Sequence, residues 1–170
     1  MRDWLAATTS AFDAHRAILG SRAVSDASRG RLLRALGEAA STYREAVYRR
    51  GFSGRTPVAV DDLLRFAARS SDFLSHSIGL ARRPDGLFHA YNVLVPGRDG
   101  SFAIEHLYEM LEGQVAALSS GAIAPQAAAA LVETVFGSEI YRADQRTFML
   151  YPDRPLSGFL EKNRIPAGAV

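Results

Sequence analysis

Apolar residues recur three, four or seven positions apart over most of this chain, and this spacing restricts it to a mainly helical fold. The pattern fills three stretches of the first half, residues 3–19, 26–50 and 61–81. Residues at these spacings share one face of an α-helix, which can then pack against a neighbour. Gly20 and Gly51 follow the first two stretches, and glycine commonly ends a helix. We therefore expect three helices that can pack antiparallel to one another.

The helical pattern breaks at Pro84, because proline cannot continue a helix. Asp85-Gly86 follows it and is a typical turn dipeptide. Residues 87–95 are rich in aromatic and β-branched side chains but too few for a helix before the next turn at 96–100. We predict a strand over 87–95 and a partner strand over 101–104.

The rest of the chain returns to helical spacing. A fourth helix is expected from about Glu105 to Leu118, and a fifth over 125–136, where Pro125 suits a first helical turn. Residues 147–151 read as a strand, and a short helix is expected near 159–160. The predicted fold class is mainly α: helical hairpins, as in an arc of an α/α-type bundle or toroid, with a few short strands.

Charge is distributed unevenly, although no linker divides the chain, and we treat residues 1–170 as one unit. Residues 1–84 hold 14 basic and 8 acidic side chains, whereas residues 85–170 hold 6 and 10. This asymmetry fits either a nucleic-acid face or complementary surfaces within a larger protein. Because acidic residues are interleaved with the arginines, we expect no nucleic-acid partner. The chain could be a fragment of a larger protein.

Several classes of function find no support in the sequence. The chain has 48% hydrophobic residues, 22% charged residues and no cysteine, which is the composition of a globular protein without disulfides or thiolate metal sites. It lacks a glycine-rich phosphate loop, a G-x-S-x-G elbow and an H-E-x-x-H motif. No stretch suits a signal peptide or a membrane span. We expect a cytoplasmic protein without a cofactor.

Residues 85–92 contain the densest group of chemically useful side chains. In a strand, His89 and Tyr91 would share one face, and Asp85 would stand at the turn as a candidate general acid or base. Asn92 is a candidate ligand-binding amide at the end of the segment. The alternative is structural: Asp85 orders its turn, His89 bonds a backbone carbonyl, and Asn92 caps a strand end.

Three glutamates lie close together after this segment. On a helix, Glu105, Glu109 and Glu112 would occupy one face, where they could bind a divalent ion or pair with arginines. Di-iron proteins carry the order Glu-x-x-His, whereas this chain has His106-x-x-Glu109. We therefore expect a solvated or salt-bridged face and no metal.

A second group of polar and aromatic residues follows the last predicted strand. Tyr151, Asp153 and Arg154 lie in a turn, and Asn163 comes shortly after it. Aromatic rings beside carboxylates and a guanidinium suit a sugar, which presents apolar ring faces and hydroxyl edges. A salt-bridged turn without a ligand would have a similar sequence.

Four segments resemble parts of long bacterial proteins that are themselves similar to glycoside phosphorylases of the cellobiose-phosphorylase type. These segments are RPDGLFHAYN at 83–92, YEMLEGQ at 108–114, FMLYPDR at 148–154 and FLEKNRI at 159–165. The resemblance implies carbohydrate-active ancestry, a toroid of paired helices and a naturally longer chain. No catalytic carboxylate of that family can be matched to a position here.

Two functional hypotheses follow. In the first, the chain is a carbohydrate-active segment whose turns at 85–92 and 151–163 form one site. Asp85 or Asp153 would act as acid or base, and a carbohydrate or phosphate ligand would be bound by His89, Tyr91, Asn92, Tyr151, Arg154 and Asn163. In the second, it is a non-catalytic helical module that self-associates or packs on a partner through uncovered apolar faces.

Overall fold

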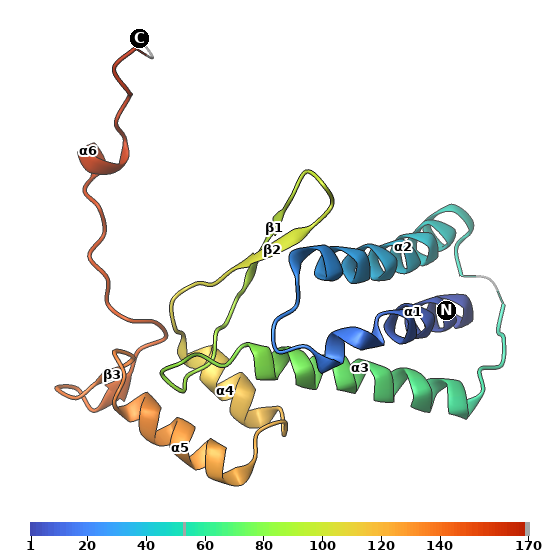
Figure 1. The fold of residues 1–170 in the computed structure, drawn as a ribbon, viewed down its shortest axis with the longest axis horizontal. Helices are drawn as coiled ribbons and strands as arrows, with labels where there is room; N and C mark the ends of the chain where they lie inside the picture. Colours follow the sequence, from blue (N-terminus) through green and yellow to red (C-terminus); the bar gives the residue numbers. More distant parts are fainter. Residues whose placement is uncertain (53, 169–170) are drawn as a thin grey trace.

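The computed structural model describes residues 1–52 and 54–168. It confirms a mainly α fold with a few short antiparallel strands (Figure 1). In chain order the elements are α1 (Arg2–Ala14), the 3-10 helix η1 (Arg16–Gly20), α2 (Asp26–Arg50), α3 (Val60–Leu80), β1 (Val93–Pro96), β2 (Phe102–Glu105), α4 (Leu111–Ser119), α5 (Pro125–Phe136), β3 (Tyr141–Arg142), β4 (Thr147–Phe148) and α6 (Phe159–Lys162).

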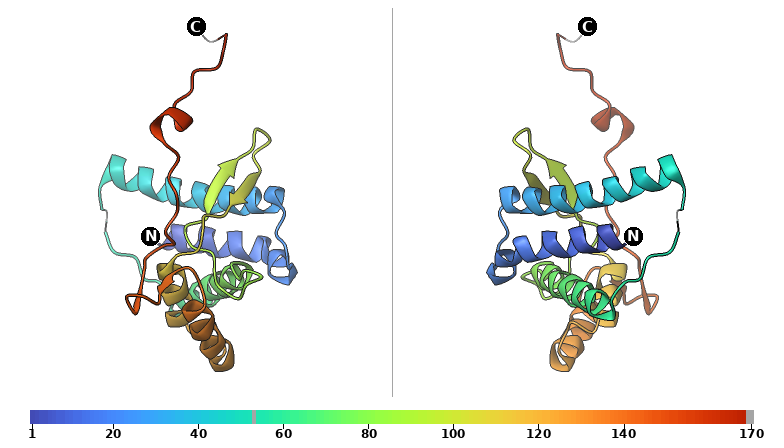
Figure 2. Two further views of the ribbon diagram at one scale, coloured as in Figure 1. Left: turned by 90° about the vertical axis from the view of Figure 1, so that its left-hand side faces the viewer. Right: turned by 90° about the vertical axis from the view of Figure 1, so that its right-hand side faces the viewer.

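The first three helices form one layer in which α1 lies between α2 and α3 (Figure 2). Aromatic rings join the three helices: between ring centroids, Trp4 lies 6.3 Å from Tyr43 of α2 and 5.5 Å from Phe66 of α3. Phe12 lies 4.8 Å from Phe73, also on α3. The prediction of one helix over 3–19 was partly wrong, because α1 ends at Ala14 and the chain tightens into η1.

A second core lies where α4 and α5 meet the end of α3. These two helices form the expected αα-hairpin, and α5 begins at Pro125. The buried side chains of this core come from the 87–88 segment and from both helices: Leu87, Phe88, Ala117, Leu131 and Val135. Burial of Leu87 and Phe88 in this core anchors the segment 85–92, because apolar area removed from water stabilises the fold.

The β1–β2 hairpin is shorter than the sequence indicates. Val93 pairs with Glu105 and Pro96 with Phe102, so that the predicted strand over 87–95 begins six residues late. Residues 87–92 instead make a single bridge between Arg82 and Phe88 before the hairpin. The strand predicted over 147–151 is limited to β4, which pairs with β3.

The tip of this hairpin packs against α2 at two glycines. A Cβ placed at Gly30 would collide with the carbonyl oxygen of Gly100, so only glycine allows this approach. Arg29 reinforces the contact, because its guanidinium donates hydrogen bonds to the carbonyl oxygens of Val24, at 2.9 Å, and Phe102, at 2.5 Å. The hairpin is therefore held to the first half of the chain.

Two glycines of α2 should respond oppositely to replacement by alanine. A Cβ added at Gly37 would meet no atom within 4 Å. Gly37→Ala should therefore raise the free energy of unfolding by about 1 kcal/mol, which is the difference in helix propensity between the two residues. Gly30→Ala should instead lower it by about 1 kcal/mol, because overpacking costs about 1–3 kcal/mol. Urea unfolding followed by circular dichroism measures both. Equal stabilisation by the two variants would show that the hairpin does not contact α2 this closely.

The chain beyond β4 leaves the helical body. Residues 151–168 run outward, and α6 stands apart from the other helices in both figures (Figures 1 and 2). Leu156, Phe159, Leu160 and Ile165 are between 74% and 92% exposed. Among the described helices, none combines the length and apolar character that crossing a membrane requires.

Candidate functional site

The candidate site begins with a tight turn after α3. Gly86 adopts φ +91°, and the Arg83 amide donates to the Leu87 carbonyl oxygen at 2.8 Å. The His89 amide donates to the Ala81 carbonyl oxygen at 2.8 Å. The predicted turn at Asp85-Gly86 is thus confirmed, and the segment after it folds back along the end of α3.

Asp85 orders this turn. Its carboxylate accepts the Leu87 amide at 3.1 Å and is bound by the Arg83 guanidinium, with contacts of 2.7–3.1 Å. The hydrogen bond from Arg83 holds the pKa of Asp85 below its ordinary value, so this carboxyl is ionised at neutral pH. The contacts give Asp85 the turn-ordering role, and a catalytic role for it stays a prediction.

Arg83 joins the turn to the segment before α4. Its Nη1 lies 3.3 Å from the Glu109 carboxylate, and both side chains are largely covered. The predicted helical stack of three glutamates is wrong, because Glu105 ends β2 and Glu112 alone lies on α4. Strand pairing of Glu105 with Val93 removes it from any helix.

Gln114 on α4 fixes the backbone of the candidate segment. Its side-chain oxygen accepts the Phe88 amide at 2.8 Å, while its amide nitrogen donates to the carbonyl oxygens of Phe88 and Met110, both at 2.9 Å. Gln114 is 1% exposed. This role could not be predicted from the sequence, in which Gln114 is a polar residue beside the apolar face of a helix.

Two histidine rings stack between the segment and the hairpin. The rings of His89 and His106 are parallel, with centroids 3.8 Å apart. His106 Nδ1 donates to the Asn92 side-chain oxygen at 2.7 Å. Burial, followed by the positive charge that His106 and Arg83 can carry, lowers the pKa of His89. His89 Nδ1 is buried and has no hydrogen-bond partner among the described residues.

Tyr91 adopts a backbone conformation that is rare for a bulky residue. Its φ is +51°, in the left-handed region that favours glycine. The side chain is 62% exposed, and its hydroxyl donates to a Glu112 carboxylate oxygen at 2.5 Å. This bond raises the pKa of Tyr91. Left-handed backbone at a non-glycine residue is enriched at functional sites, where surrounding contacts hold it.

A cavity of about 410 Å³ opens beside Tyr91. Its floor is apolar, and its polar lining comes from Glu112, His89 and Tyr91. The remaining lining residues are Ile78, Ala81, Phe88, Ala90, Gly113, Ala116 and Ala117. An apolar cavity of this size with a few polar groups at its edge is typical of a small-molecule site.

The second predicted turn contacts a different part of the same region. The Tyr151 and Tyr108 rings lie 6.0 Å apart, and the Arg154 guanidinium lies 5.0 Å from the Tyr108 ring centre. Asp153 is exposed. Asn163 is the C-cap of α6, and its side chain donates to the Phe159 carbonyl oxygen at 2.9 Å. The structure thus brings Tyr151 and Arg154 to Tyr108 and gives Asn163 a contact within its own helix.

Residues 108–114 connect both turns. Glu109, Glu112 and Gln114 contact the 83–92 segment. Tyr108 contacts the 151–154 turn, and the Leu111 amide donates to the Leu150 carbonyl oxygen at 2.8 Å. Residues 108–114 therefore contact two of the other three segments that carry the resemblance, 83–92 and 148–154.

Comparison with known proteins adds no family to these observations. No family model matches the chain, and no curated protein is similar to it.

His89 should make stability depend on pH. The pKa of His89 is depressed below 6.5, so the unfolded chain binds this proton more readily than the folded protein. Stability from His89 is therefore complete above pH 6.5 and declines as the pH falls below it. The free energy of unfolding, measured with urea, should fall between about pH 7 and pH 5.5. We expect this fall to be smaller in His89→Gln than in the original protein. His76→Gln is the control, since the His76 ring contacts the Ser21 carbonyl oxygen away from this segment, and it should leave that loss unchanged.

Proposed function

We propose that this chain is a carbohydrate-binding segment of a carbohydrate-active protein of the glycoside phosphorylase type, with its sugar site at the cavity beside Tyr91 and Glu112. The observation that carries the proposal is the exposed Tyr91 side chain beside this cavity. The Tyr91 backbone is left-handed, and the Tyr91 hydroxyl donates a hydrogen bond to the Glu112 carboxylate. The resemblance of residues 82–165 to such proteins agrees with it, and so does the contact among the segments that carry that resemblance.

The chemistry of the cavity suits a sugar. The apolar floor and the Tyr91 ring can pack against the C–H face of a pyranose, as exposed aromatic rings do. The Glu112 carboxylate can accept hydrogen bonds from sugar hydroxyls, and the phenol of Tyr91 can both donate and accept. Such groups bind and orient a sugar. The proposal assigns no bond cleavage to them, and acid or base catalysis by Asp85 or Asp153 remains a separate prediction.

Replacing Tyr91 with glycine should separate binding from folding. Glycine removes the ring and accepts the left-handed backbone, so the free energy of unfolding should stay within about 1 kcal/mol of the original. The affinity for cellobiose, measured by titration calorimetry, should fall at least about ten-fold, since aromatic stacking and a hydroxyl contact are lost together.

The matched control is Tyr48→Gly on α2, whose tyrosine is 80% exposed and remote from the cavity. This variant should lose helix stability but keep its affinity for cellobiose. Glu112→Gln should weaken binding by a smaller factor, because an amide oxygen still accepts a hydroxyl. Unchanged affinity in Tyr91→Gly, or no binding of cellobiose or glucose to the unaltered protein, would refute the proposed site.

The exposed C-terminal segment favours a second candidate, a helical module that self-associates or packs on a partner. Phe159 and Leu160 are 77% and 78% exposed on α6, which makes few contacts with the body. Exposed apolar side chains in such a group are typical of an interaction surface. Light scattering should then give the mass of a dimer, and the double variant Phe159→Ser, Leu160→Ser should give a monomer. A monomer in the unaltered protein would contradict self-association.

A further inference from the structure

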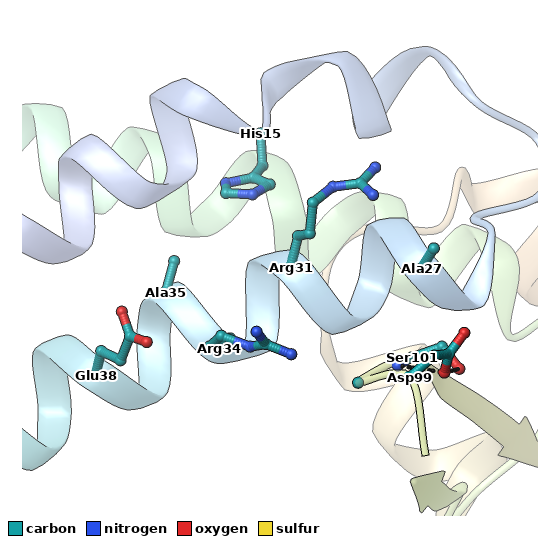
Figure 3. A pocket seen from close by; sticks show the side chains of 9 residues that line it. His15, Ala27, Arg31, Arg34, Ala35, Glu38, Asp99 and Ser101 are labelled. Atoms are coloured by element: carbon teal, nitrogen blue, oxygen red, sulfur yellow. Dashed lines mark hydrogen bonds between the residues drawn. The ribbon is translucent and has the colours of Figure 1, made fainter. Parts of the chain in front are cut away.

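A second cavity lies where the hairpin tip meets α2. Its volume is about 400 Å³, and it is lined by side chains from α2, the end of α1 and the hairpin turn (Figure 3). The polar lining residues are His15, Arg31, Arg34, Glu38, Asp99 and Ser101. None of them belongs to the sugar site proposed above.

Two arginines of this cavity lack a carboxylate partner. Arg31 and Arg34 lie one helical turn apart on α2, and neither forms an ion pair with any described residue. Arg31 donates only to the Ser28 hydroxyl, at 3.0 Å. In contrast, Arg29 on the same helix is bound to Asp26. Guanidinium groups without a protein anion are suited to bind a ligand oxyanion, often through two parallel hydrogen bonds.

The fold builds this cavity from rigid parts. Gly100 has φ +80°, and a Cβ there would collide with the Arg34 guanidinium, which therefore lies directly against the turn. The close approach of Gly30 to Gly100 fixes the turn against α2. Asp99 Oδ1 accepts from the amide and hydroxyl of Ser101, at 3.0 and 2.6 Å, and these two bonds order the turn.

The other polar groups indicate hydroxyls on the ligand. His15 Nδ1 donates to the Ala11 carbonyl oxygen at 2.8 Å, which directs the other ring nitrogen, Nε2, to a ligand. Nε2 of a neutral histidine accepts a hydrogen bond. Glu38 also accepts only, and it would repel a second anionic group. The cavity therefore combines two cations, which suit one oxyanion, with two carboxylates, Glu38 and Asp99, that can accept hydrogen bonds from ligand hydroxyls.

We propose that this cavity binds a small hydroxylated oxyanion, with its phosphate or carboxylate between Arg31 and Arg34 and its hydroxyls toward His15 and Glu38. The test is titration calorimetry at constant ionic strength with glycerol 3-phosphate, glycerate and glycerol. Saturable binding of at least one of the two oxyanions is expected, and the stronger of the two identifies the anionic group. Glycerol should not bind. Failure of both oxyanions, or equal binding of glycerol, overturns the proposal.

Substitutions locate the site on α2. Arg31→Gln and Arg34→Gln should each weaken binding of the oxyanion by about ten-fold, because a charge-assisted hydrogen bond is lost. Both side chains are exposed, so the variants should retain the circular dichroism of the original. Arg44→Gln is the matched control, since Arg44 lies on the same helix outside the cavity and bonds only Ser41. A similar loss in Arg44→Gln would mean that the helix attracts anions through its overall charge, and the site would be rejected.

Glu38→Gln tests the sign of the ligand's charge. Removal of a carboxylate beside a bound anion should tighten binding, by about three-fold at a solvent-exposed position. Weaker binding in Glu38→Gln would mean that the carboxylate favours the bound ligand, and this result would contradict an oxyanion placed close enough to Glu38 to be repelled by it.

Discussion

Replacing Gln114 with leucine is expected to lower the free energy of unfolding by about 3 kcal/mol, although leucine has a similar volume. Gln114 is 1% exposed and satisfies the amide and carbonyl of Phe88 and the carbonyl of Met110. Leucine would leave these backbone groups buried without partners, and each unsatisfied group costs about 1–3 kcal/mol. Urea unfolding followed by circular dichroism measures the loss.

Gln126→Leu on α5 provides the matched control. Gln126 is exposed, so its replacement should change stability by less than about 0.5 kcal/mol. Equal effects of the two substitutions would show that the hydrogen bonds of Gln114 do not hold the candidate segment. Since the position of Tyr91 depends on the backbone that Gln114 fixes, Gln114→Leu should also weaken sugar binding.

The second large effect is expected from Leu87→Ala. Leu87 is 2% exposed and lies in the core formed with α4 and α5. Truncation of a buried leucine removes apolar contacts and leaves a cavity, and this costs about 2–5 kcal/mol. Thermal or urea unfolding measures the change.

Leu156→Ala is the control for this substitution, because Leu156 is 92% exposed. Its replacement should be neutral to within about 0.5 kcal/mol. If Leu87→Ala were equally mild, the turn at 83–88 would be a surface loop without a place in the core. The candidate site would then lose the rigid support on which the proposed function depends.

Helices could be predicted from sequence because their signals are local. The periodic spacing over 26–50 and Gly51 after it determine most of α2, whose C-cap glycine has φ +68°. Pro125 likewise indicates the first turn of α5. These features depend on residues within one or two turns of each other, so a single sequence contains the information.

The errors arose where distant contacts outweigh local preference. Residues 105–110 have helical character, yet pairing of β2 with β1 holds Glu105 extended, and the Leu111 amide is bound by the Leu150 carbonyl. In the same way, residues 87–92 have the composition of a strand, but Gln114 on α4 supplies the hydrogen bonds that a neighbouring strand would give. Tertiary contacts of this kind cannot be read from composition.

The contacts of the candidate segment could not be predicted from sequence, and the site itself stays a prediction. Within the segment 85–92, which holds the densest group of polar side chains, Phe88, His89, Ala90 and Tyr91 line a cavity. It could not show that Tyr91 would pair with Glu112 or that His89 would stack on His106, because these partners lie in separate elements. The expected meeting of Asp85 with Asp153 stays a prediction.

The most direct test of the proposed sugar site uses the four histidines of the chain. His89 lines the cavity, and the His106 ring stacks on the His89 ring. His15 and His76 lie in the layer formed by the first three helices. Proton–carbon correlation spectra of the imidazole rings should be recorded during titration with cellobiose at constant pH. We expect saturable shifts of the His89 and His106 signals, with the His15 and His76 signals unchanged. Signals that do not move, or shifts confined to His15 and His76, would contradict a sugar site beside Tyr91.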